Sequence, residues 1–115
     1  MTSLHHLALR VQDLDAVHAF YAQWFGLTIV RDLRPRALWL GLGEHSVLML
    51  EIRAQHEPVI DTRSMELVAF TISGDERQSM RTRLVAQHML EAETEHTLYF
   101  RDPEGRRVAL SSFPL

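Results

Sequence analysis

The stretch that decides the fold is Tyr99-Phe-Arg-Asp-Pro-Glu-Gly-Arg-Arg-Val-Ala-Leu-Ser111. It reads as one strand, a tight Asp-Pro-Glu-Gly turn and a returning strand. Pro103 fixes its own φ and Gly105 accepts a left-handed angle, as a turn of this kind requires. We therefore predict that the chain ends in a hairpin of Thr97 to Arg101 and Arg107 to Ser112.

The first half of the chain predicts a strand, a helix and three further strands. Asp13 offers an N-cap to a run with apolar residues at helical spacing, and Gly26 is suited to end that helix. The last two strands are separated only by Gly43-Glu44-His45, which indicates a hairpin. The predicted strands are Leu4 to Val11, Leu27 to Arg31, Ala37 to Leu42 and Ser46 to Ile52.

The second half repeats this order after a polar linker at 54–64, which contains Pro58 and lacks periodicity. A strand is predicted at Glu66 to Ser73, and a helix from Gly74 to about Leu90. A short, poorly defined segment at Glu91 to Glu95 then precedes the final hairpin. The helix is expected to place four apolar side chains on one side, namely Met80, Leu84, Val85 and Met89.

These patterns predict one α+β domain of two βαβββ modules, at about 1–53 and 65–115. We expect their strands to form an open, cupped mixed sheet with the helices outside. Strand alternation then divides the side chains between a packed face and the cup. The packed face should include Leu38, Leu40, Leu48, Leu50, Ile52, Val68 and Phe70, and the cup His6, Arg10, Trp39, Met49, Glu51, Leu67, Tyr99, Arg101 and Ala109.

Composition excludes several classes of function. The 115 residues carry a net charge of −3 and no basic block, which argues against a nucleic-acid partner. The absence of cysteine excludes disulfides, thiolate ligands and a cysteine nucleophile. The sequence contains no apolar run that could cross a bilayer and no signal peptide pattern, so we expect no membrane partner and a cytoplasmic protein.

The layout resembles the vicinal oxygen chelate superfamily over nearly the whole chain. The residues that carry the resemblance are His6 to Leu14, Phe20-Tyr21, Phe25-Gly26-Leu27 and the terminal hairpin. That group includes glyoxalase I, extradiol dioxygenases, fosfomycin-resistance thiol transferases and bleomycin-resistance proteins. The resemblance implies a divalent metal site in the cup for most members, and a small-molecule ligand or substrate.

The positions that match the family's metal ligands are mostly apolar in this chain. His6 matches the histidine of the first strand, but Leu67, Met49 and Ala109 stand where the other donors are expected. A divalent ion needs several converging donors, so His6 alone is a poor site. Glu51 is a possible substitute, one step along from Met49 on the cup side; Glu66 would require a one-residue slip.

Several cup residues are candidates for ligand binding, each with a structural alternative. His6 can hydrogen-bond a ligand or act as a base, or it can be a half-buried residue inherited from the fold. Tyr99 resembles a substrate-contacting tyrosine of the fosfomycin-resistance members, and Trp39 can stack on a planar ligand, but both can equally fill the cup. Arg10 and Arg101 can attract an anion, although Arg101 is better explained as a tie across its hairpin.

The sequence therefore predicts a homodimeric, metal-free binding protein that holds a small organic molecule, with no cofactor. The predicted ligand-contacting residues are His6, Arg10, Trp39, Met49, Leu67, Tyr99 and Ala109. The alternative is a lyase, extradiol dioxygenase or thiol transferase that uses a divalent metal ion. A third hypothesis is a degenerate partner subunit without a ligand.

Overall fold

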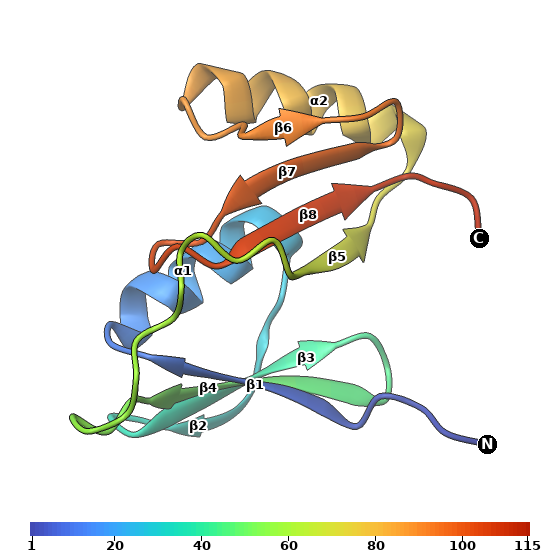
Figure 1. The fold of residues 1–115 in the computed structure, drawn as a ribbon. Helices are drawn as coiled ribbons and strands as arrows, with labels where there is room; N and C mark the ends of the chain where they lie inside the picture. The colour runs from blue at the N-terminus through green and yellow to red at the C-terminus, as the bar shows by residue number, and fades with distance from the viewer. The chain divides into compact units, whose positions relative to one another are not determined.

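The polar segment 54–64 contains neither helix nor strand in the computed structural model, which describes all 115 residues. The chain divides within this segment into two units, Met1–Val59 and Ile60–Leu115 (Figure 1). Each unit has its own sheet and its own helix. Neither helix is long and apolar enough to span a membrane.

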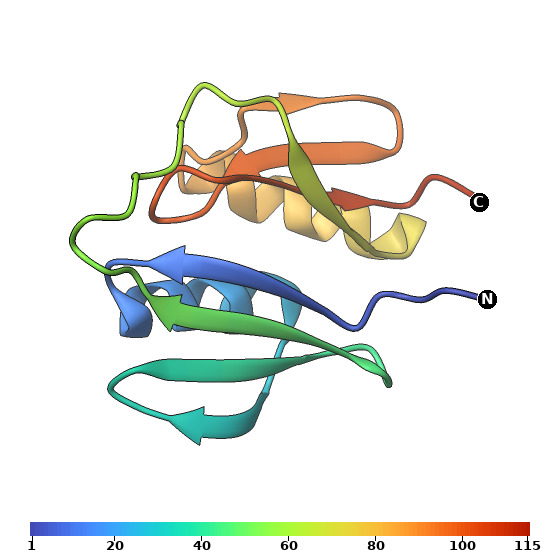
Figure 2. The same ribbon diagram turned by 60° about the horizontal axis from the view of Figure 1, so that its bottom comes forward.

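The first unit is a four-stranded mixed sheet with one helix. The strand order is β1-β4-β3-β2, with β1 parallel to β4 and the other neighbours antiparallel (Figure 2). The two hairpin strands have the predicted bounds. The elements are β1 (His6–Val11), α1 (Leu14–Phe25), β2 (Ile29–Leu33), β3 (Ala37–Leu42) and β4 (Ser46–Ile52).

Helix α1 begins and ends where its capping residues predict. The Asp13 side chain accepts a hydrogen bond from the Ala16 N–H at 3.0 Å, and Gly26 adopts a left-handed φ of 67°. The helix packs on β3 and β4. Its buried side chains contribute about 1.5–3 kcal/mol each by leaving water. They are Leu14, Val17, Phe20, Tyr21 and Trp24.

Several predicted details of this unit are wrong. Strand β1 begins at His6 rather than Leu4, and β2 ends at Leu33 rather than Arg31. Strand β2 begins at Ile29 rather than Leu27, because the Leu27 N–H is directed to the Tyr21 carbonyl at 3.4 Å as the helix ends.

Ile52 is 38% exposed rather than packed, since it is the last residue of β4. Leu38, Leu40, Leu48 and Leu50 are buried as predicted. Leu42, which alternation also assigns to the packed face, is only half-buried at the end of β3.

The second unit repeats the plan of the first. Its strand order is β5-β8-β7-β6, and β5 runs parallel to β8 just as β1 runs parallel to β4. The predicted α+β fold of two βαβββ modules is thereby confirmed. The elements are β5 (Leu67–Thr71), α2 (Gly74–Ala86), β6 (Ala92–Glu93), β7 (Thr97–Arg101) and β8 (Arg107–Ser111).

Helix α2 is shorter than the sequence predicts, and it buries fewer of its apolar side chains. A capping box joins Ser73 and Glu76 at its start, but it ends at Ala86 rather than near Leu90. The end follows from His88, which adopts a positive φ of 57° that a helix cannot continue through. Leu84 is the buried residue of this helix, whereas Val85, predicted beside it, is 45% exposed.

Candidate functional site

On the first unit, the strand face that the sequence assigns to ligand binding carries a row of four side chains across the sheet. The register pairs Ala8 with Met49, Met49 with Trp39, and Trp39 with Arg31. The Arg31 guanidinium lies 4.8 Å from the centre of the Trp39 ring. The Trp39 indole nitrogen is buried and has no hydrogen-bond partner. Trp39 therefore offers part of its aromatic ring next to Met49, while its indole N–H is buried and closed to a ligand in this structure.

His6 lies at the start of the same face, away from Glu51. Its register partner is Val47, four positions before Glu51, which corresponds to roughly 13 Å along the strand. His6 instead contacts the His5 ring, with 2.9 Å between the two Nδ1 atoms. The strand predicted from Leu4 begins only at His6, so strand alternation does not extend to His5.

Arg10 is held by carboxylates of its own unit. Its Nε and Nη2 atoms donate to the two Glu57 carboxylate oxygens at 2.9 and 2.7 Å, and its Nη1 lies 3.6 Å from Glu51. The Arg10 hydrogen bonds, helped by the Ala54 N–H, lower the pKa of Glu57 to about 2. Arg10 thus fastens the start of the linker, and two protein carboxylates already balance its charge.

On the second unit, Leu67, Tyr99 and Ala109 occupy adjoining positions of the sheet. Ala109 lies between Ala69 and Tyr99 in the register and is 0% exposed, so it has no surface for a ligand in this structure. Leu67 is paired with Arg107, whose guanidinium lies 4.3 Å from the centre of the Tyr99 ring. The sequence reasoning missed Arg107, although alternation from Ala109 places it on the same face.

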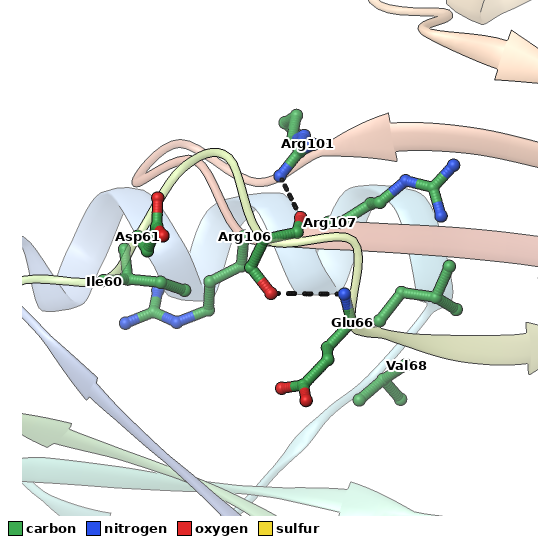
Figure 3. A pocket seen from close by; sticks show the side chains of 9 residues that line it. Ile60, Asp61, Glu66, Val68, Arg101, Arg106 and Arg107 are labelled. Atoms are coloured by element: carbon green, nitrogen blue, oxygen red, sulfur yellow. Dashed lines mark hydrogen bonds between the residues drawn. The ribbon is translucent and has the colours of Figure 1, made fainter.

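A pocket of about 460 Å³ adjoins this part of the second unit (Figure 3). It lies where the segment before β5 meets the turn between β7 and β8. Both apolar and charged side chains line it, and the charged ones include three arginines. The lining residues are Ile60, Asp61, Ser64, Glu66, Leu67, Val68, Arg101, Arg106 and Arg107.

The turn beside the pocket is rigidly built. Asp102 is buried, and its Oδ1 accepts from the backbone N–H groups of Glu104 and Arg106 at 2.8 and 3.0 Å. Gly105 has a φ of 91°, and a Cβ there would meet the Thr62 side chain at 2.5 Å. These contacts support the prediction that Asp102 and Gly105 serve the turn.

Arg101 ties the hairpin to its neighbours. Its guanidinium donates to Glu91 at 2.6 and 3.1 Å, to the Ser64 carbonyl at 3.2 Å and to the Gly105 carbonyl at 3.1 Å. A dashed line marks one of the hydrogen bonds that Arg101 donates beside the pocket (Figure 3). Arg101 has therefore the structural role that the sequence favoured.

The residues of the two units do not fit a metal site of the kind that the resemblance implies. Neither unit contains a group of three or more His, Asp or Glu side chains that could hold an ion. Met49, Leu67 and Ala109 supply no oxygen or nitrogen donor, and Glu51 is directed toward Arg10 rather than His6. No chemical step is therefore assigned to a metal in this chain.

Comparison with known proteins links this architecture to one family. The model of the Glyoxalase/Bleomycin resistance protein/Dioxygenase superfamily matches residues 3–110. Metallothiol transferase FosB from Lysinibacillus sphaericus (strain C3-41) is 29% identical over 119 residues, which cover 91% of this chain and 78% of that protein.

Solved structures agree with this result. Lactoylglutathione lyase from Agrobacterium tumefaciens superposes with a TM-score of 0.69 at 25% identity, over 96% of this chain and 93% of that one. The fosfomycin resistance protein FosX from Listeria monocytogenes superposes with a TM-score of 0.82 at 18% identity, over 100% and 94% of the two chains. At that lower identity the likeness concerns the fold alone.

Proposed function

Because the chain belongs to the Glyoxalase/Bleomycin resistance protein/Dioxygenase superfamily, we propose that it binds a small organic molecule without the metal ion that the family resemblance implies. The proposed function is binding rather than catalysis. Of the predicted contact positions it retains His6, Trp39, Met49, Leu67 and Tyr99. Arg10 is bound by Glu57, and Ala109 is fully buried, so these two are not retained.

The observation that carries this proposal is the chemistry of the expected donor positions. Three of them are occupied by Leu67, Met49 and Ala109, which cannot ligate a hard divalent ion. The fourth, His6, is separated from its substitute partner Glu51 by four strand positions. A lone imidazole does not fix the geometry that a metal site needs.

Two features support binding of a small molecule. Trp39 offers an aromatic surface with the Arg31 guanidinium 4.8 Å from its ring centre. The pocket of the second unit, at about 460 Å³, lies within the range of roughly 300–1,000 Å³ typical of small-molecule sites. Both combine apolar surface with a few polar groups, which is the usual composition of such sites.

A metal-dependent enzyme is the second candidate. The likeness to proteins named Metallothiol transferase FosB and lactoylglutathione lyase supports a thiol transferase or a lyase, and the family description adds a dioxygenase. Such an enzyme would need a donor set that neither unit assembles from its own residues.

Metal content tests the two candidates directly. The protein is purified without chelator, and its divalent metals are measured by mass spectrometry for the wild type, His6→Ala and the control His45→Ala. His45 lies in the exposed hairpin turn between β3 and β4. We expect substoichiometric metal in all three proteins. A stoichiometric ion that is lost in His6→Ala but kept in His45→Ala would contradict the metal-free proposal.

The homodimer and the cytoplasmic location belong to the same proposal. Each sheet has two edge strands, β1 and β2 in the first unit and β5 and β6 in the second. Pairing with a second copy is one way to cover such edges. Light scattering coupled to size exclusion measures the assembly; a monomer at all concentrations would contradict the homodimer.

A further inference from the structure

Arg107 is the least satisfied cation beside the pocket of the second unit. Its side chain is 10% exposed, and its Nε atom is buried without a hydrogen-bond partner. Its hydrogen bond to the Met65 carbonyl is long, at 3.5 Å. A guanidinium has five N–H donors, and leaving them unused in a buried site costs free energy. Arg107 is therefore equipped to accept a further partner.

The charges around Arg107 do not balance. Glu91 is bound closely by Arg101 at 2.6 Å, whereas the Arg107 Nε lies 3.9 Å from the same carboxylate. Arg101 is accordingly the main cause of the lowered pKa of Glu91, and Arg107 adds a smaller share. Two guanidinium groups share one carboxylate, so the cluster of Arg101, Glu91 and Arg107 retains one positive charge.

The remaining carboxylates near the pocket are directed to other groups. Asp102 lies 3.2 Å from the Arg106 guanidinium, and the Asp61 carboxylate lies 3.2 Å from Arg63. The Glu66 carboxylate points away from the Arg107 guanidinium (Figure 3). These acids leave the excess charge at Arg107 uncompensated.

The aromatic ring of Tyr99 fixes how Arg107 can bind. A guanidinium stacked on a ring is held in one plane, and its planar fork matches the two oxygens of a carboxylate. Leu67, the register partner of Arg107, supplies apolar surface in the same pocket. A monoanion with an apolar body would thus satisfy both parts of the lining.

We propose that this pocket binds a small organic acid, whose carboxylate contacts the Arg107 guanidinium and whose apolar body lies against Leu67. The inference rests on the proposed function and gives its ligand a chemical class. A single negative charge matches the single excess positive charge. The pocket volume of about 460 Å³ limits the ligand to a small molecule.

Calorimetric titration with benzoate and benzamide tests the proposal on the full chain. The two probes share a ring and a similar size, but only benzoate carries a charge. We expect saturable binding of benzoate and at least about tenfold weaker binding of benzamide, as the loss of charged hydrogen bonds predicts. Equal affinity for the two probes, or no binding of benzoate, would overturn the inference.

Variants locate the binding at Arg107. Arg107→Gln should weaken benzoate at least about tenfold, and Arg107→Lys should fall between it and the wild type, because lysine keeps the charge but lacks the fork. Arg63→Gln is the matched control: it removes the same charge from a side chain that is 90% exposed and near the pocket in sequence. Unchanged affinity in Arg107→Gln, or an equal loss in Arg63→Gln, would refute the assignment.

Two further measurements keep the result interpretable. Circular dichroism checks the fold of each variant, and the Arg107 Nε–H resonance of the wild type reports contact without any substitution. This resonance must shift on addition of benzoate. Should a neutral or cationic compound bind the wild type while benzoate does not, the binding function stands and the organic-acid inference falls. If compounds of every charge fail to bind, both are rejected.

Discussion

The two units share one strand order, but they differ in how far neighbouring carboxylates balance the charge of their arginines. In the first unit, Arg10 is bound by Glu57 with two short hydrogen bonds and has Glu51 nearby. In the second, Arg107 lies 3.9 Å from a carboxylate that Arg101 already occupies. A repeated topology therefore does not repeat the balance of charge. The difference assigns a structural role to the first arginine and a binding role to the second.

The helices of the two units also differ, in how many side chains they bury. Helix α1 buries five side chains against its sheet, among them Phe20, whereas α2 buries Leu84. Since burial of apolar surface is the main favourable term in folding, the first unit has the better anchored helix.

The largest effect is expected for Phe20→Ala in α1. Phe20 is buried and packs edge-on against the Tyr21 ring, with 5.2 Å between the ring centres. Its removal leaves a cavity and should lower the free energy of unfolding by about 3–5 kcal/mol. Urea unfolding measures the change. Gln23→Ala, at an exposed position of the same helix, should change the stability by less than about 0.5 kcal/mol.

Leu84→Ala is expected to detach α2. Leu84 is fully buried, so the substitution should cost roughly 2–3 kcal/mol, toward the lower end of values for leucine truncations. Hydrogen exchange should lose protection in Gly74–Ala86 more than in α1, because α2 has few other anchors. Val85→Ala is the matched control and should be nearly neutral. Equal loss of protection in both helices would contradict the contrast between the units.

Local signals in the sequence were sufficient for most of the fold. Asp13 and Gly26 mark both ends of α1, and the hairpin of β3 and β4 has the predicted bounds. The end of α2 was not predictable, since it depends on a left-handed histidine, His88, where glycine is the usual signal. Val85 was misplaced because a polar helix with few apolar residues has no clear buried face.

The candidate site was less predictable than the fold. Glu57, which balances Arg10, lies 47 residues away in a linker, and no spacing rule connects the two. Arg107 stands two positions from Ala109, so alternation alone places it on the same strand face. Its unused hydrogen-bonding capacity depends on the positions of Arg101 and Glu91, which only the structure provides.

Helix caps should give an intermediate effect of similar size in both units. Asp13→Ala and Ser73→Ala each remove a side chain that accepts a backbone N–H at the start of a helix. Each should cost about 1 kcal/mol, measured by urea unfolding. Asp13→Asn and Ser73→Thr keep the acceptor and serve as controls. A much larger loss for Ser73→Ala would indicate that α2 depends on its cap more than on packing.

The smallest effect is expected on stability at acid pH, where the ion pair of Glu57 and Arg10 is lost. The pKa of Glu57 is lowered from 4.5 to about 2, mainly by its hydrogen bond to Arg10. A carboxylate with a lowered pKa in the folded state stabilises the fold above its unfolded pKa. That contribution is lost as the pH falls from about 4.5 toward 2. In Arg10→Gln, carbon-detected NMR should show the Glu57 pKa rising toward its ordinary value.

Glu91 is the carboxylate of the second unit that corresponds to Glu57 of the first. Its pKa tests whether Arg10 and Arg107 differ in charge balance. Its pKa is lowered chiefly by Arg101, with Arg107 contributing only through charge. Arg101→Gln should therefore raise the pKa of Glu91 clearly, and Arg107→Gln should raise it much less. A larger response to Arg107→Gln would mean that Glu91 already satisfies Arg107, as Glu57 satisfies Arg10. The excess positive charge on which the organic-acid site depends would then be absent, and the two arginines would share one structural role.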